Sequence, residues 1–164
     1  MHYPKIAEEL LAMEREDQQM RDKALDDAQA WDSSIDERNT ERLRAIIAEI
    51  GWPTVSKVGS DASHAAWLIA QHADRNTEFQ KEVLSLLEQQ ESGEIRKQEI
   101  AYLTDRVLVN EGKPQRFGTQ FYRFEDGSLH ARPLENPELV STIRKEFELD
   151  TLEENIARMD KYRR

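Results

Sequence analysis

The sequence predicts a mainly α-helical fold with six or seven helices around a buried central helix and one small β-hairpin near residues 117–132. Three observations support this prediction. Apolar residues recur at steps of three, four and seven through most of the chain, which is typical of amphipathic helices. Residues 62–73 are apolar on nearly every side, as expected of a helix at the centre of a fold. A strand-like pattern occurs only around Asp126-Gly127, a pair that favours a hairpin turn.

The first half of the chain is expected to form four helices in succession. Residues 32–37 interrupt the apolar pattern after the first helix, and Asn39 or Thr40 is a suitable cap for the second. Gly51 stands in the usual place for the end of that helix, and Pro53 prevents its continuation. The expected elements are helices over residues 5–31, 39–50 and 62–73, a loop over residues 51–59, and a fourth helix that opens at Thr77.

The second half is expected to begin with a helix over residues 94–107 and to continue into the hairpin. Asn136-Pro137 is a capping residue followed by a proline at the first helical position, so a sixth helix is expected to start there. Asp150 or Thr151 is a suitable cap for a last helix. Because 164 residues is a common size for one domain, we expect residues 1–164 to form a single globular helical domain.

Composition and charge exclude several classes of function. The chain has 33 acidic and 23 basic residues, and its net charge of -10 repels phosphate backbones and anionic lipids. No stretch approaches the ~20 apolar residues of a membrane span, and the first residues lack the apolar centre of a signal peptide. The absence of cysteine excludes disulfides, thiolate nucleophiles and zinc–thiolate sites. We therefore expect a cytoplasmic protein that binds neither nucleic acid nor membrane.

Polar residues at positions where the helical pattern predicts apolar ones are the candidates for a site. Asp17 lies four residues after Met13 on the apolar stripe of the first helix, and Arg21 follows one turn later. Such a pair forms either a surface ion pair or a half-buried pair whose guanidinium binds a carboxylate or phosphate. His72 interrupts the stripe of the third helix, either as a satisfied core residue or as a general acid or base.

A second group of polar residues follows the fifth predicted helix. Asp105 and Arg106 stand at its end, either as solvated charges or as groups held by the following loop. Gln115 and Gln120 bracket a glycine in that loop, and their amides suit either ligand recognition or an ordinary hairpin edge. The chain has no nucleophile elbow and no phosphate-binding loop motif. One Asp-x-x-His pair at residues 61–64 is only half of a helical metal motif, so no metal is expected.

Short polar and glycine-containing motifs are spread over most of the chain. They are Asp17-Gln18 with Arg21, Gly51-Trp52-Pro53-Thr54, Gly59, Ala65-Ala66-Trp67, Gln71-His72-Ala73-Asp74, Gln80, Ala101-Tyr102-Leu103-Thr104-Asp105-Arg106, Gly112-Lys113-Pro114-Gln115, Gly118-Thr119-Gln120 and, more loosely, Pro133-Leu134-Glu135-Asn136-Pro137. Together they resemble an uncharacterised bacterial family that is defined as a domain of unknown function. Two features depart from that family: Phe117 replaces a tyrosine, and the tail after Asn136 lacks an Arg-Arg pair.

Two classes of function follow from these residues. The first is a protein that binds a small polar or anionic ligand, with hydrolysis or group transfer as the simplest chemistry. The second is an acidic partner-binding module, such as an immunity, adaptor or inhibitor protein, whose partner is a basic protein. The sequence leaves open which cofactor, if any, is bound and whether the protein is an enzyme. In the first class the catalytic candidates are His72 and Asp105, and the ligand-binding candidates are Asp17, Arg21, Gln71, Arg106, Gln115 and Gln120, all expected on one concave surface.

Overall fold

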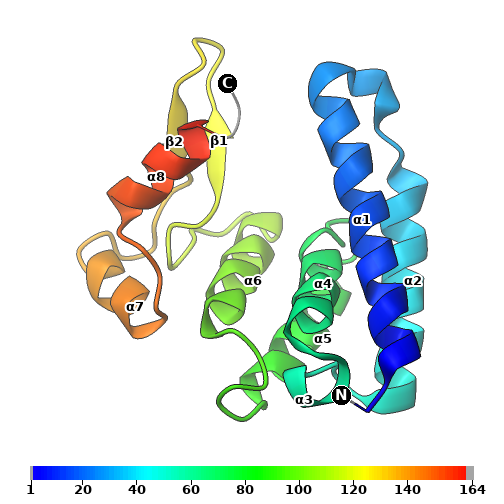
Figure 1. Cartoon of the computed structure of the whole chain (residues 1–164). Coiled ribbons are helices and arrows are strands. Elements are labelled where there is room, and N and C mark those ends of the chain that lie inside the picture. Colours follow the sequence, from blue (N-terminus) through cyan, green and yellow to red (C-terminus); the bar gives the residue numbers. More distant parts are fainter. Residues whose placement is uncertain (1, 162–164) are drawn as a thin grey trace. The chain divides into compact units, whose positions relative to one another are not determined.

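Helices account for most of the chain in a computed structural model that describes residues 2–161 (Figure 1). The residues group into two compact units, Met1–Arg96 and Lys97–Arg164. The mainly helical fold with one small hairpin is confirmed. That residues 1–164 form a single globular domain stays a prediction. Within residues 2–161, no helix combines the length and the apolar character needed to span a bilayer.

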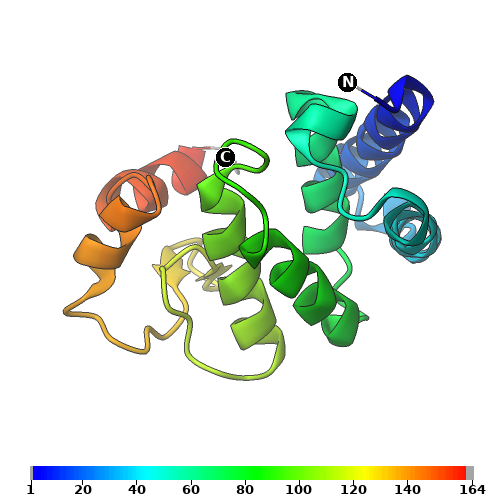
Figure 2. The same ribbon diagram turned by 90° about the horizontal axis from the view of Figure 1, so that it is seen from below.

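The first unit is a group of helices around α4. This helix contacts four others, and its alanine-rich surface allows them to approach closely. Ala65, Ala66 and Ile69 are buried, which confirms the expected central helix. Helices α1 and α2 run beside each other and beside α4 (Figure 2). The elements of the unit are α1 (Pro4–Asp26), a 3-10 turn η1 (Ala28–Ala30), α2 (Ser33–Ile50), α3 (Val55–Val58), α4 (Ser60–Gln71) and α5 (Thr77–Glu88).

The start of α2 differs from the sequence prediction. The helix begins at Ser33 and not at residues 39–40, because the Asp32 side chain caps it by accepting the Ser34 backbone N–H at 2.9 Å. The first helix correspondingly ends at Asp26 and not at residue 31. The predicted break over residues 32–37 is therefore wrong. The loop expected over residues 51–59 also contains the short helix α3.

The second unit combines three helices with an antiparallel pair of strands. Its elements are α6 (Lys97–Asn110), β1 (Phe121–Arg123), β2 (Leu129–Ala131), α7 (Val140–Glu146) and α8 (Leu152–Lys161). In the hairpin Tyr122 pairs with His130, and α8 packs against β2. Helix α6 begins at Lys97 and not at residue 94. The sixth predicted helix begins at Val140, because Asn136 first forms a turn with Leu139.

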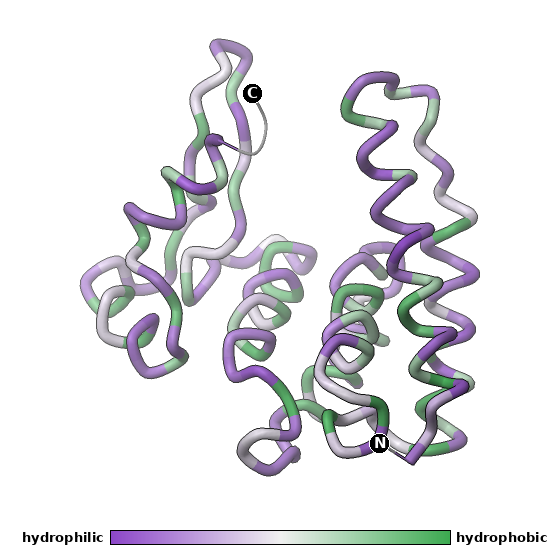
Figure 3. The backbone as a smooth tube through the Cα atoms, in the orientation of Figure 1, coloured by the Kyte–Doolittle hydropathy of each residue, from purple (hydrophilic) through white to green (hydrophobic). Residues whose placement is uncertain are grey.

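Hydrophobic and hydrophilic positions alternate along α1, α2 and α6, whereas α4 is mostly hydrophobic (Figure 3). Amphipathic helices bury one stripe against a neighbour and expose the other. A polar residue on the buried stripe therefore needs a partner inside the protein. Asp17 on α1 and Asp105 on α6 are two such residues, and each unit contains one of them.

Candidate functional site

An aspartate–histidine pair joins α1 to the end of α4. His72 is the C-terminal cap of α4, and its backbone N–H donates to the carbonyls of Leu68 and Ile69. Its Nδ1 lies 3.0 and 2.9 Å from the two carboxylate oxygens of Asp17. A carboxylate only accepts hydrogen bonds, so Nδ1 carries the proton of this contact. Asp17 is 1% exposed, and the packing of α1 on α4 therefore fixes the orientation of the ring.

The Asp17 carboxylate has two further partners. Gln18 donates its Nε2 at 2.7 Å, and Arg21 donates its Nε at 3.1 Å. Arg21 also donates an Nη2 hydrogen to Asp36 on α2 at 2.7 Å, so its guanidinium bridges two carboxylates. The same guanidinium lies 4.9 Å from the centre of the Trp31 ring. Of the two predicted alternatives for the Asp17–Arg21 pair, the geometry is that of the half-buried one.

Burial and charge act in opposite directions on the two carboxylates. Burial alone would raise the pKa of Asp17, but the hydrogen bond and charge of His72, with Arg21 and Gln18, hold that pKa below its ordinary value. Burial raises the pKa of Asp36, and the charge of Asp17 adds to this effect while Arg21 opposes it. The ionised form of Asp17 is thus stabilised mainly by His72, whereas Arg21 only partly offsets the burial of Asp36.

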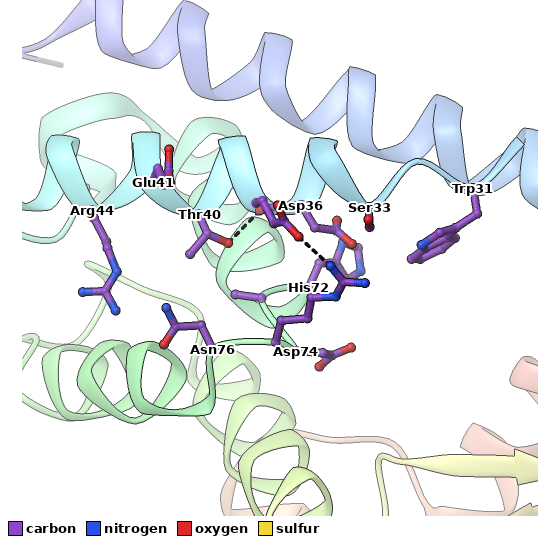
Figure 4. Close-up of a pocket in the computed structure, with 12 residues that line it drawn as sticks. Trp31, Ser33, Asp36, Thr40, Glu41, Arg44, His72, Asp74 and Asn76 are labelled. Carbon is purple, nitrogen blue, oxygen red and sulfur yellow. Dashed lines mark hydrogen bonds and ion pairs between the residues drawn. The ribbon is translucent and has the colours of Figure 1, made fainter.

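His72 lines a cavity of about 500 Å³ between α2 and the segment that joins α4 to α5. Figure 4 shows Trp31 at one end of this cavity and Arg44 at the other, with Asp36 and His72 between them. The lining residues are Trp31, Ser33, Asp36, Glu37, Thr40, Glu41, Arg44, His72, Ala73, Asp74, Arg75 and Asn76. Within the described residues, His72 makes no hydrogen bond through Nε2. The ring therefore keeps one nitrogen without a hydrogen bond in a residue that lines the cavity.

The sequence interpretation missed two residues of this site. Trp31 was placed inside the first helix, whereas it follows η1 and is exposed at the cavity. Asp36 was placed in a break, whereas it stands in the first turn of α2. The signal that identifies Asp36 is Asp32 as a cap, because a helix that starts at residue 33 turns Asp36 and Thr40 to the same side.

In the second unit, Asp105 holds the segment that follows α6. Its carboxylate is fully buried and accepts the backbone N–H groups of Arg116, Phe117 and Thr119 at 2.7 to 2.9 Å, and the Thr119 hydroxyl at 2.9 Å. Burial raises the pKa of Asp105, and these donors oppose that change. The contacts correspond to the predicted alternative in which the following loop holds Asp105.

Glutamine side chains hydrogen-bond within the same segment. The Gln115 side chain donates to the backbone carbonyls of Gln120 and Arg132, and its oxygen accepts the Gln120 N–H at 2.8 Å. Arg106 donates to the Gln120 side-chain oxygen at 3.0 Å. The Gln115 amide thus binds the protein's own backbone, and the Gln120 amide binds the side chains of Arg106 and Thr119.

A buried arginine completes the support of this segment. Arg144 is 1% exposed and donates to the carbonyl of Phe117 at 2.7 Å and to Asp150. Sequence reasoning missed it, although it lies one turn after the buried Val140 on the same side of α7. The segment around Gly118 is thus held from α6 and from α7.

The predicted site residues fall into two groups. The first unit brings together Asp17, Arg21 and His72, with Gln71 buried in the last turn of α4. The second unit brings together Asp105, Arg106, Gln115 and Gln120. That the two groups share one concave surface stays a prediction. Within residues 2–161, no three His, Cys, Asp or Glu side chains gather in a way that could hold a metal ion.

Comparison with known proteins identifies a family. A family described as "Family of unknown function (DUF6624)" matches residues 4–163. No curated protein and no solved structure matches the chain. The match extends over both units and over nearly the whole sequence, so it confirms the resemblance to a family of unknown function. The chain belongs to this family, DUF6624.

Proposed function

We propose that the cavity of the first unit binds a small polar ligand and that His72 exchanges a proton with it, as in a hydrolase or transferase. The observation that supports this most is the His72 ring, whose Nδ1 is bonded to the buried Asp17 while the residue lines the cavity. A carboxylate on one imidazole nitrogen fixes the tautomer and makes the other nitrogen a better base. Proteins use this arrangement to accept a proton from a hydroxyl or a water.

Each neighbour has a distinct role in this proposal. Asp17 orients the ring and stabilises the imidazolium that forms when His72 accepts a proton. Asp36 lines the same cavity, and because its pKa is raised it retains a proton to higher pH than an ordinary aspartate. Arg21 already binds both carboxylates, which favours a polar ligand over an anionic one at this guanidinium.

We propose a structural role for the polar residues of the second unit. Four donors already occupy the Asp105 carboxylate, so a catalytic role for Asp105 would require breaking a closed hydrogen-bond set. The ligand-binding roles of Arg106, Gln115 and Gln120 stay predictions. The alternative of an acidic module for a basic protein partner also stays a prediction, supported by the net charge of -10.

Carbethoxylation tests the role of His72 without knowledge of the substrate. Diethyl pyrocarbonate reacts with an unprotonated, accessible imidazole nitrogen, and mass spectrometry resolves the products at the chain's four histidines. We expect His72 to react, and to react several-fold more slowly in Asp17→Asn. The exposed His130, outside this network, should react equally in both proteins. A His72 that does not react, or that reacts equally in Asp17→Asn, would contradict the proposal.

A chromogenic panel of esters, phosphodiesters and glycosides then tests for catalysis. Any turnover that depends on the site should fall by about 100-fold or more in His72→Ala, the size typical of a lost general acid or base. His130→Ala is the matched control and should retain the parent rate. Turnover that survives His72→Ala would exclude His72 as the proton-transfer group.

A further inference from the structure

Gln80 is a polar residue on the buried stripe of α5. It is fully buried, and it precedes Val83 by one turn and Leu87 by two turns, both of which are also fully buried. An amphipathic helix places apolar residues at such positions. A buried carboxamide needs hydrogen-bond partners, and those of Gln80 lie at the end of α4.

The Gln80 side chain binds the last carbonyl groups of α4. Its Nε2 lies 3.3 Å from the carbonyl oxygen of Ala70 and 3.2 Å from that of Gln71. The same nitrogen lies 3.4 Å from a carboxylate oxygen of Asp74. The last carbonyls of an α-helix lack donors within the helix. Gln80 supplies donors at this place, so a side chain of α5 completes the end of α4.

The connection that Gln80 holds is one wall of the His72 cavity. Residues 72–76 join α4 to α5, and each of them lines the cavity (Figure 4). The last of them, Asn76, caps α5 by accepting the backbone N–H of Phe79 at 3.1 Å. The wall is therefore bound at both ends, at α4 through Gln80 and at α5 through Asn76.

The imidazole of His72 is thus supported from two directions. Its Nδ1 contacts the Asp17 carboxylate at 2.9 and 3.0 Å, whereas its backbone directly follows the Gln71 carbonyl that Gln80 binds. A reacting side chain must keep its geometry within about 0.5 Å, which requires support behind it. A shift of about 1 Å at the end of α4 would lengthen the contact with Asp17 beyond a hydrogen bond.

We propose that Gln80 is a positioning residue for His72, which fixes the end of α4 and thereby keeps the imidazole in contact with Asp17 at the cavity wall. Gln80 is buried behind this wall and would touch no ligand, so it acts only through the backbone at the end of α4. This inference rests on the proposed function, because it assigns the support of the same imidazole.

NMR of protein labelled with ¹⁵N in its histidine rings tests the inference. The Nδ1 hydrogen of His72 should appear far downfield in the parent protein, because the buried Asp17 accepts it. Gln80→Met keeps the length of the side chain and removes the amide, so this hydrogen should exchange with water about fivefold faster or more, the factor expected for one lost hydrogen bond. Val83→Ala, the matched control, removes packing from the same stripe of α5 but keeps the amide, and should change the exchange by less than about twofold.

The outcomes separate positioning from a general contribution to stability. Equal acceleration in Gln80→Met and Val83→Ala, or an unchanged His72 signal in Gln80→Met, would overturn the inference and leave the carbethoxylation test unaffected. A His72 that fails carbethoxylation would overturn the proposed function even where Gln80 orders the ring. A parent protein without a protected Nδ1 hydrogen would overturn both.

A measurement on the parent protein decides the case in which Gln80→Met does not fold. The Nε2 hydrogens of Gln80 should exchange with water at least about tenfold more slowly than those of Gln89, whose side chain is exposed at the end of α5. Slow exchange would support the inference. Equal exchange at the two residues would show that α4 does not hold the Gln80 amide and would overturn it.

Discussion

Replacing Asp17 with asparagine should destabilise the protein by about 2 to 3 kcal/mol at pH 7, because buried hydrogen bonds to a charged group are each worth about 1.5 to 3 kcal/mol. The carboxylate is 1% exposed and accepts hydrogen bonds from His72, Arg21 and Gln18. Asparagine keeps the shape and one acceptor oxygen, and Arg21 keeps Asp36, so the loss is smaller than the sum of the three bonds. Urea unfolding of parent and variant measures the difference.

The pH dependence of this difference has a fixed sign. The pKa of Asp17 is lowered in the folded protein, so its contribution is present above the unfolded-state pKa, about 3.9. The contribution is lost as the pH falls through the lower folded-state pKa. The gap between parent and Asp17→Asn should therefore be large at pH 7 and shrink below about pH 4. A gap that grows on acidification would show that the carboxylate is not stabilised in its ionised form.

A double-mutant cycle isolates the Asp17–His72 contact. We expect a coupling of about 1 to 2 kcal/mol between Asp17→Asn and His72→Ala, within the range for contacting residues in one network. The same cycle with His130→Ala, which lies outside the network, should be additive to within about 0.5 kcal/mol. Additivity of Asp17→Asn with His72→Ala would refute the claim that α1 positions the imidazole.

Three further predictions concern packing and the second unit. Gly118→Ala should lower the free energy of unfolding by about 2 kcal/mol or more, because Gly118 has φ +71° and a Cβ there would lie 2.9 Å from a methyl group of Leu152. Gly127→Ala, at φ +84°, places its Cβ within 4 Å of no atom and should lower it by about 1 kcal/mol. Asp105→Ala should lower the free energy of unfolding by about 3 kcal/mol or more, since three backbone N–H groups lose their acceptor. The segment after α6 should then become sensitive to proteolysis. Ala66→Asp should prevent stable folding, because it places an unpaired charge at a fully buried position of α4; a melting temperature within about 2 °C of the parent would contradict this.

The helical pattern predicts most of the fold because burial of one stripe requires a period near 3.6. The helical character of α5 follows directly from this rule, and the central position of α4 follows from its apolar residues on nearly every side. The start of α2 does not, because Asn39 and Thr40 are buried polar residues on the stripe where the rule expects apolar ones. A cap such as Asp32 determines that start through one hydrogen bond, which periodicity does not detect.

The sequence identifies the members of the site better than their pairings. Asp17 and His72 are each off-pattern, but they are 55 residues apart, and only the packing of α1 on α4 makes them partners. Asp36 and Trp31 are not off-pattern under the wrong helix boundary, so helical periodicity alone does not select them, although the Asp32 cap places Asp36 in the first turn of α2. Long-range contacts of this kind depend on the tertiary arrangement, whereas helical periodicity is a local property.

The two polar clusters differ in what remains for a ligand. Around Asp105, the carboxylate and the Gln115 amide bond the protein's own backbone, and a fully satisfied buried network of this kind rigidifies its surroundings. Asp17 contacts the His72 ring only through Nδ1, and His72 also lines a cavity. An oriented imidazole at a cavity is what proton transfer requires, and a closed network is what a loop support requires. We therefore propose that a ligand be sought first at His72, and we expect loss of Asp105 to release the segment that follows α6.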